Sequence, residues 1–163
     1  MIVHPIPPLY DENSKILILG SFPSVKSREA QFFYGHPQNR FWKVVSSIFG
    51  EDCPSTTEAK RAFLMRNGIA AWDVIKECDI EGSSDSSIKN VTPNDLSVIL
   101  QNAPIRQIFV NGGTAYKYFV RYNKDLSAIR LPSTSPANAA FSLQRLIEEW
   151  RIIRDIGDGY EYK

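Results

Sequence analysis

Short apolar runs alternate along the chain with longer segments in which apolar residues recur at helical spacing. The apolar runs cover residues 15–20, 68–75, 105–112 and 128–132. Each run is brief and contains β-branched residues, which is typical of a buried strand rather than a helix. The pattern therefore predicts four strands.

Five segments show helical periodicity: residues 40–49, 55–68, 92–102, 113–122 and 137–155. The second opens with Ser55 and Glu58 at capping-box spacing and ends at Gly68. The third begins at Thr92 and carries Pro93 in its first turn, where proline is favoured. The last is the longest, and its leucine, isoleucine and tryptophan residues share one face.

Strands that alternate with helices are typical of a parallel sheet covered by helices on both faces. We therefore predict an α/β fold, a three-layer α/β/α sandwich with a central four-stranded, mainly parallel sheet. Ligands of such folds bind outside the carboxyl ends of the strands. The polar, serine-rich segment 79–91 is expected to be a loop.

Length and composition indicate a single domain over residues 1–163. The apolar content of 43% is sufficient for a sizeable core. Cys53 and Cys78 lie far apart without a Cys-x-x-Cys pair, so they cannot assemble a zinc knuckle or a four-cysteine cluster. We expect no metal and no other cofactor.

Residues 1–10 lack the basic and apolar regions of a signal peptide, and no apolar run is long enough to span a membrane. We therefore expect a cytoplasmic protein that does not bind membranes. The net charge of +1 neither requires nor excludes a nucleic-acid partner. Phosphate contacts need only a local basic rim.

The sequence GSFPSVKS at residues 20–27 nearly matches a nucleotide-binding phosphate loop, with Lys26 and Ser27 in place. Val25, however, stands where the second glycine belongs, and Pro23 lacks a backbone N–H. Such a loop needs consecutive N–H groups and left-handed backbone angles. The substitutions therefore disfavour a nucleotide hydrolase.

Two further segments combine residue types that suit nucleic-acid chemistry. Residues 32–42, FFYGHPQNRFW, surround polar groups with aromatics, which suits a pocket that stacks and reads an extruded base. Phe41 and Trp42 are expected to be core residues of the helix that follows. Residues 131–139, LPSTSPANA, place small hydroxyl residues before a helix, where they would contact phosphate or simply cap the helix.

Together these segments resemble the uracil-DNA glycosylase superfamily over nearly the full chain. The mismatch-specific thymine/uracil branch carries a similar His-Pro-x-Asn-Arg-Phe-Trp stretch, here residues 36–42. That branch has a water-activating Asn just before the loop proline, where this sequence has Phe22. A hypoxanthine-DNA glycosylase branch has an apolar residue there, and its motifs resemble residues 20–23, 34–42 and 133–137.

This resemblance implies a monofunctional DNA glycosylase of base excision repair that acts as a monomer. It would hydrolyse the N-glycosidic bond of a flipped deaminated base in DNA, with hypoxanthine favoured and uracil also open. No lysine is placed for a Schiff base, so we expect no strand cleavage. A mismatch-type uracil/thymine glycosylase and a non-catalytic lesion-binding relative remain as alternatives, the latter because of Phe22.

The resemblance also assigns the chemistry to particular residues. Asn39 would position the water, and His36 would donate to the leaving base or brace the loop. The predicted base pocket consists of Gly20, Ser21, Phe22, Tyr34, Asp73 and Asn111.

Two of these residues have more specific expected roles. Tyr34 would stack on the base. Asp73 stands where uracil-specific relatives have Asn, and its carboxylate would accept the N1–H of hypoxanthine or bond to a local turn.

Contacts to the DNA backbone are expected from two serine-proline loops and from nearby positive charge. The predicted backbone-binding residues are Pro23, Ser24, Lys26, Arg40, Ser133, Thr134, Ser135 and Pro136. For the two basic residues, scattered solubilising charge is the alternative interpretation.

Overall fold

The computed structural model describes residues 1–159, and its centre is a four-stranded sheet. The strands are β2 (Ile16–Gly20), β3 (Ile69–Asp73), β6 (Gln107–Asn111) and β7 (Ala128–Leu131). They are all parallel, in the order β3-β2-β6-β7. All four predicted strands are confirmed.

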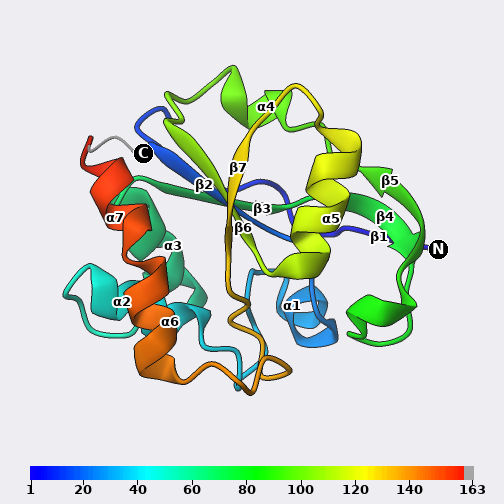
Figure 1. The fold of residues 1–163 in the computed structure, drawn as a ribbon, viewed down its shortest axis with the longest axis horizontal. Coiled ribbons are helices and arrows are strands. Elements are labelled where there is room, and N and C mark those ends of the chain that lie inside the picture. The colour runs from blue at the N-terminus through cyan, green and yellow to red at the C-terminus, as the bar shows by residue number, and fades with distance from the viewer. Residues whose placement is uncertain (160–163) are drawn as a thin grey trace.

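Helices cover both faces of this sheet, which confirms the predicted three-layer arrangement (Figure 1). One side carries α2 (Phe41–Ile48), α3 (Thr57–Arg66), α6 (Leu143–Trp150) and α7 (Ile152–Gly157). The other side carries α5 (Gly113–Tyr122). Two short helices, α1 (Val25–Ala30) and α4 (Ser97–Leu100), lie in the connections.

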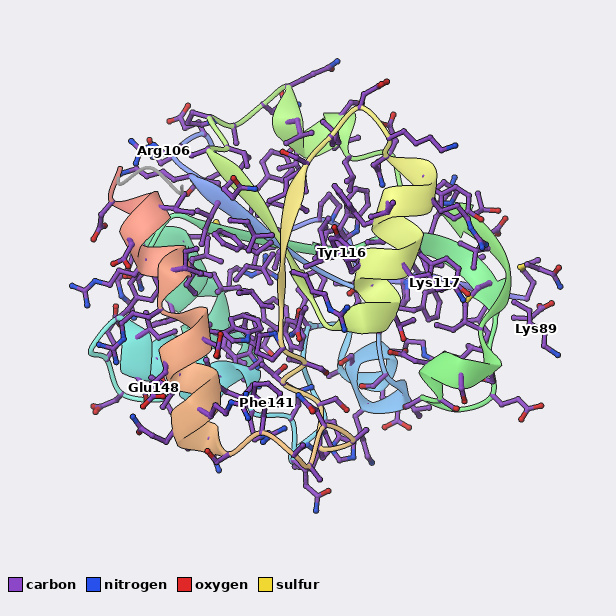
Figure 2. The ribbon with its side chains drawn as sticks, viewed as in Figure 1. Lys89, Arg106, Tyr116, Lys117, Phe141 and Glu148 are labelled. Atoms are coloured by element: carbon purple, nitrogen blue, oxygen red, sulfur yellow. The ribbon has the colours of Figure 1, made fainter. Side chains whose placement is uncertain are left out.

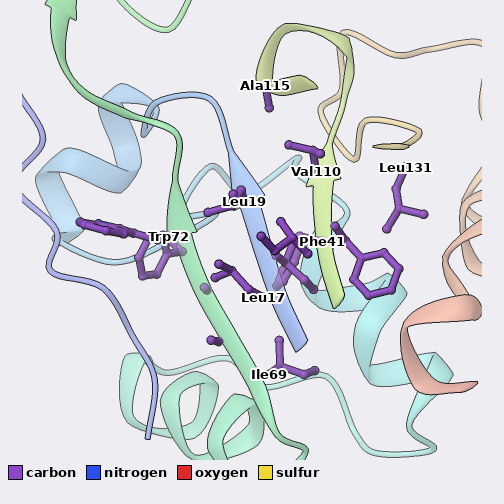
Figure 3. Packing of buried hydrophobic residues seen from close by; sticks show 14 of the residues in the cluster. Leu17, Leu19, Phe41, Ile69, Trp72, Val110, Ala115 and Leu131 are labelled. Atoms are coloured by element: carbon purple, nitrogen blue, oxygen red, sulfur yellow. The ribbon is translucent and has the colours of Figure 1, made fainter. Parts of the chain in front are cut away.

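The core forms where the sheet meets these helices. Every residue of β2 and β3 is buried, as the continuous apolar runs of doubly covered strands require. Leu17 and Leu19 of β2, Ile69 and Val110 of the neighbouring strands and Phe41 of α2 all belong to one cluster of buried residues (Figure 3). The burial explains why short apolar runs were sufficient to predict these strands.

A second, antiparallel sheet was not predicted. It consists of β1 (Ile2–Val3), β4 (Ile75–Asp79) and β5 (Lys89–Pro93), in the order β1-β4-β5. The prediction of a loop over 79–91 is therefore wrong at both ends, and a 3-10 turn (Asp85–Ser87) lies between. This sheet lies at one side of the molecule, and Lys89 on β5 extends away from its body (Figure 2).

Three predicted helix boundaries are also wrong. The helix expected from Thr92 begins only at Ser97, because β5 continues to Pro93 as an edge strand, where proline is tolerated. The cap of α3 is Thr56, whose side chain accepts the Ala59 N–H, and not Ser55. The long helix expected over 137–155 is two helices, which start only at Leu143.

After β1, which belongs to the second sheet, the chain runs past β3 of the main sheet. Leu9 pairs with Ala71 of β3, and the Trp72 indole donates to the Ile6 carbonyl. The backbone N–H of His4 donates to the carbonyl of Lys76 at 2.7 Å. These contacts bring His4 to the carboxyl end of β3. Within residues 1–159, no helix is long and apolar enough to cross a membrane.

Candidate active site

A cavity of about 480 Å³ opens at the carboxyl ends of the parallel strands. Gly20 ends β2, Asp73 ends β3 and Asn111 ends β6, and all three line the cavity. Parallel strands bring these ends to one edge of the sheet, which is where α/β folds bind ligands. The volume is within the range of small-molecule pockets.

The structure brings nearly all predicted site residues together around this cavity. The lining includes Gly20, Ser21, Phe22, Pro23, Ser24, Tyr34, His36, Asn39, Asp73, Asn111, Ser133, Thr134, Ser135 and Pro136. Only Lys26 and Arg40 lie outside it. Lining residues that sequence reasoning missed are Ser27, Phe33, Ser83, Ser84, Asp85, Ser86 and Ala137.

A directional chain of hydrogen bonds fixes the amide of Asn39. The Thr134 N–H donates to Oδ1 of Asn111 at 3.1 Å, so Nδ2 of Asn111 must be the donor to the Thr134 hydroxyl, at 3.0 Å. The hydroxyl in turn donates to Oδ1 of Asn39 at 2.8 Å. Oδ1 of Asn39 also accepts the Phe41 N–H at 2.9 Å, at the start of α2. The amide NH₂ of Asn39 is therefore the part left to act in the cavity.

Arg40 holds the loop that precedes α6 and contains the LPSTSPANA segment, residues 131–139. Its guanidinium donates to the carbonyls of Ser135 at 2.9 Å and Asn138 at 3.0 Å, and also to those of Thr134 and Phe141. These bonds take up most of its N–H groups, so the side chain supports the loop. Lys26 is exposed and lies 3.7 Å from Glu29 on the same short helix.

Asp73 is paired with a residue that the sequence did not point to. Oδ2 of Asp73 lies 2.7 Å from Nε2 of His4, and both side chains are almost fully buried. Nδ1 of His4 accepts the Ile6 N–H at 3.1 Å, so Nε2 carries the ring proton and donates it to the carboxylate. The only sequence signal for His4 was its residue type.

Gly20 makes room for the Asp73 carboxylate. A Cβ atom at Gly20 would lie 2.5 Å from Oδ1 of Asp73, well inside contact distance. The two residues are register partners on adjacent strands. The glycine is therefore required by the close approach of the carboxylate.

Tyr34 has an unusual backbone and a buried, unpartnered hydroxyl. Its φ is +51°, a left-handed angle that is uncommon outside glycine. One ring face stacks on Phe41 at 3.9 Å between centroids. The hydroxyl has no hydrogen-bond partner among residues 1–159. Burial, with the nearby Asp73 carboxylate, raises the pKa of Tyr34 well above its ordinary value, so the hydroxyl keeps its proton.

The structure is compatible with both roles predicted for His36, bracing the loop and donating a proton to the leaving base. Its carbonyl accepts the Asn39 N–H at 3.0 Å, which braces the turn before α2. Its ring lines the cavity, and Nδ1 accepts the Gln38 N–H at 3.1 Å. A neutral His36 therefore carries its ring proton on Nε2, where it is available as a donor.

Comparison with known proteins identifies the family. The model of the uracil DNA glycosylase superfamily matches residues 7–156. The chain belongs to this superfamily. It is 39% identical to a hypoxanthine DNA glycosylase of Methanosarcina acetivorans over 156 residues, covering 94% of this chain and 98% of the relative. A hypoxanthine DNA glycosylase of Methanosarcina barkeri is 41% identical over 114 residues, covering 69% of this chain and 72% of the relative.

A solved structure supports the same assignment of the glycosylase fold. It is the solution NMR structure of a candidate uracil DNA glycosylase from Methanosarcina acetivorans. The TM-score is 0.80 at 38% sequence identity, and the match covers 97% of this chain and 99% of that one.

In this glycosylase, the segment 83–86 forms part of the cavity lining. The Ser21 hydroxyl donates to Oδ1 of Asp85 at 3.0 Å, and the Val25 N–H donates to the Ser83 hydroxyl at 2.9 Å. Burial, with the neighbouring Asp73 carboxylate, raises the pKa of Asp85, and the bond from Ser21 opposes this. In the sequence, this segment shows only polarity and serine content.

The two serine-proline loops differ in whether their serine hydroxyls already donate a hydrogen bond within the protein. Ser24 caps α1 and its hydroxyl donates to Ser27 at 3.0 Å. The hydroxyls of Ser133 and Ser135 each accept a backbone N–H two residues ahead. Among residues 1–159, these two hydroxyl protons have no acceptor, so they are available to an anionic ligand at the rim.

Proposed function

We propose that this protein is a DNA glycosylase that hydrolyses the N-glycosidic bond of hypoxanthine flipped out of DNA. The observation that carries the proposal is the Asp73 carboxylate at the end of β3, which presents an acceptor to the cavity. The N1–H of hypoxanthine is flanked by one carbonyl, whereas the N3–H of uracil is flanked by two, which a carboxylate repels. Relatives that cover most of the chain are named hypoxanthine DNA glycosylases, which supports the same substrate.

The reaction replaces the bond from C1′ to N9 with a bond from C1′ to a water oxygen. The electron pair of the broken bond leaves on the purine, and the sugar passes through a cationic state. The departing purine takes up one proton, and the water gives up one after attack. The products are free hypoxanthine and an abasic site in an uncut strand.

Asn39 is proposed to position the attacking water. Because Oδ1 is occupied by Phe41 and Thr134, the NH₂ group donates to one lone pair of the water and leaves the other for C1′. A neutral amide costs less than an ionised group in a closed pocket. His36, with its proton on Nε2, is the proposed donor to the departing purine.

Base stacking and DNA contacts complete the proposed site. Tyr34 offers the ring face that Phe41 does not cover. The free hydroxyl protons of Ser133 and Ser135 are proposed to bind phosphates beside the flipped nucleotide.

We further propose that residues 1–163 form one domain that acts as a cytoplasmic monomer without a metal. Light scattering would check the oligomeric state, and metal analysis would check the metal content.

Single-turnover release of base tests this function. The substrates are duplexes containing deoxyinosine, deoxyuridine, deoxyxanthosine or a G·T mismatch, each with wild type, Asn39→Ala and Asn39→Asp. Asn39→Asp retains the acceptor for Phe41 and Thr134 but removes the NH₂ donor. We expect rapid hypoxanthine release by wild type and a rate at least about 100-fold lower for both variants, with unchanged DNA affinity in the uncharged variant Asn39→Ala.

The alternatives give different results in the same assay. Faster release of uracil or mismatched thymine than of hypoxanthine would identify a mismatch-type enzyme. DNA binding without release of any base would identify a lesion-binding protein, in which Phe22 marks a lost activity. Full activity of Asn39→Asp would show that the amide NH₂ does not hold the water.

A further inference from the structure

The two oxygens of the Asp73 carboxylate have different surroundings. Oδ2 accepts the Nε2–H of His4 at 2.7 Å, and His4 does not line the cavity. Oδ1 has no hydrogen-bond donor among residues 1–159 and faces the gap left by Gly20, which does line the cavity. The pocket therefore receives one acceptor from a group that has two.

One free acceptor distinguishes hypoxanthine from guanine. Guanine is hypoxanthine with an added 2-amino group, so both bases carry O6 and N1–H. A carboxylate with two free oxygens pairs best with guanine, because it accepts N1–H and the adjacent amino N–H together. A glycosylase with such a carboxylate would therefore favour an undamaged base that is present throughout DNA.

We propose that His4 sets the preference for hypoxanthine over guanine, by holding Oδ2 of Asp73 on the side away from the cavity, so that only Oδ1 can accept from a base. The proposal rests on the proposed function and goes beyond it to a residue that does not touch the base. With Oδ2 engaged, Oδ1 still accepts N1–H of hypoxanthine. Guanine bound in the same way would bury an amino group without an acceptor, which is costly.

The structure holds His4 firmly in this position. Its ring meets Phe22 edge-on at 5.8 Å between centroids and lies at a tilt to Phe33 at 6.5 Å. Its Nδ1 accepts the Ile6 N–H, which fixes the proton on Nε2. The contacts with Phe22, Phe33 and the Ile6 N–H oppose rotation of the imidazole ring, so His4 keeps its bond to Oδ2 when a base enters.

Hydrogen bonds also fix the backbone that carries the Asp73 side chain. The buried Asn94 side chain donates to the carbonyls of Asp73 at 2.9 Å and of Ile75 at 3.2 Å, on either side of the turn between β3 and β4. The Val74 N–H donates to the carbonyl of Gly20 at 2.8 Å. Rotation of Asp73 to present both oxygens would require the loss of the His4 bond.

A matched pair of variants tests this role. His4→Gln places an amide N–H near the position of Nε2 and keeps the donor to Asp73, whereas His4→Leu removes it at similar size. Each protein is assayed for single-turnover release of hypoxanthine and guanine placed opposite thymine. Each is also titrated with duplexes that carry the non-cleavable 2′-fluoro analogues of deoxyinosine or deoxyguanosine at that position.

We expect His4→Leu to lower the ratio of inosine to guanosine affinity by about tenfold or more, as the gain of a bidentate base contact implies. His4→Gln should keep the wild-type ratio. A purely structural role of His4 would weaken binding of both duplexes equally and leave the ratio unchanged. An unchanged ratio in a cooperatively folded His4→Leu protein therefore overturns the proposal.

Two further arms keep the result interpretable. If His4→Leu fails to fold, His4→Asn takes its place, because its shorter amide can still accept the Ile6 N–H but does not reach Asp73; the same loss of preference is expected. The non-cleavable duplexes report base preference without catalysis. Absence of hypoxanthine release by wild type would thus refute the proposed function, while the affinity ratio would still decide the role of His4.

Discussion

Replacement of Thr134 by Val tests whether the hydrogen-bond chain behind Asn39 serves catalysis. Thr134 is fully buried, and its hydroxyl both accepts from Asn111 and donates to Asn39. Valine has nearly the same shape but cannot make either bond. Among residues 1–159, the Phe41 N–H would then be the only hydrogen-bond partner left to orient the Asn39 amide.

The magnitude follows from the groups left without partners. Loss of the hydroxyl removes two hydrogen bonds, and Nδ2 of the half-buried Asn111 loses this acceptor, which costs about 1 kcal/mol of stability for each bond. For a chain of this size, that cost lowers the thermal midpoint by about 2–4 °C per kcal/mol. Without the Thr134 bond, the Asn39 amide should point its NH₂ at the water only part of the time. We expect the single-turnover rate to fall about tenfold as a result, equivalent to about 1.4 kcal/mol.

The assay is single-turnover release of hypoxanthine at saturating enzyme, beside thermal and urea unfolding. Thr134→Ser is the matched control, because it keeps the hydroxyl and loses only a methyl group. We expect Thr134→Ser to retain most of the rate and Thr134→Val to lose it without loss of DNA affinity. A Thr134→Val protein that is less stable but fully active would refute the reasoning, because the chain would then support only the fold.

Three other substitutions test base recognition by Asp73, support of the loop by Arg40 and the charge of Asp85. Gly20→Ala places a Cβ atom against Oδ1 of Asp73 and should lower kcat/KM for hypoxanthine about tenfold or more, together with the thermal midpoint, because the buried carboxylate must move away from the new atom; a wild-type kcat/KM would mean that Asp73 does not read the base. Arg40→Met should cost about 1–3 kcal/mol in urea unfolding, since its carbonyl partners lose their donors, yet leave the salt dependence of DNA binding unchanged; a shallower salt dependence would instead show a phosphate contact. Asp85→Asn should strengthen DNA binding at neutral pH, and the difference from wild type should vanish as pH falls through the raised pKa of Asp85 and its carboxyl becomes neutral; a difference that persists at low pH would exclude charge as the cause.

The strands and the place of the site could be predicted because both follow from local patterns. Residues of β2 and β3 are buried on both faces, so their runs are continuously apolar and short. Once the strands are parallel, Gly20, Asp73 and Asn111 must lie at the same edge. No knowledge of packing was needed for either step.

The second sheet and the last helix depend on contacts that no local pattern records. Strands β4 and β5 pair with register shifts near Glu77, which interrupt the alternation that would have identified them. Residues before Leu143 could have continued a helix by spacing alone. They remain irregular, and the Arg40 guanidinium binds their carbonyls from almost a hundred positions earlier.

Residue types in the site were predictable, whereas their orientation was not. Asn39 was identified by its motif, but only the Thr134 and Phe41 bonds show that its NH₂ is the free group. His4 pairs with Asp73 across 69 positions, and neither residue carries a sequence pattern that points to the other. Such a pair becomes visible only after β3 and the N-terminal segment are placed side by side.

The two departures from the mismatch-specific branch, Phe22 and Asp73, are linked through His4. The Phe22 ring is almost fully buried and covers the imidazole edge-on, on the side facing the first loop. An amide at position 22 would compete for the His4 proton and admit water beside the His4–Asp73 hydrogen bond, which would weaken the hold on Oδ2. An apolar residue there preserves the single acceptor, and the amide for the water must then come from another element. In the proposed mechanism, Asn39, fixed from behind by Thr134, supplies that amide, so base selection falls to Asp73 and water positioning to Asn39 within one cavity.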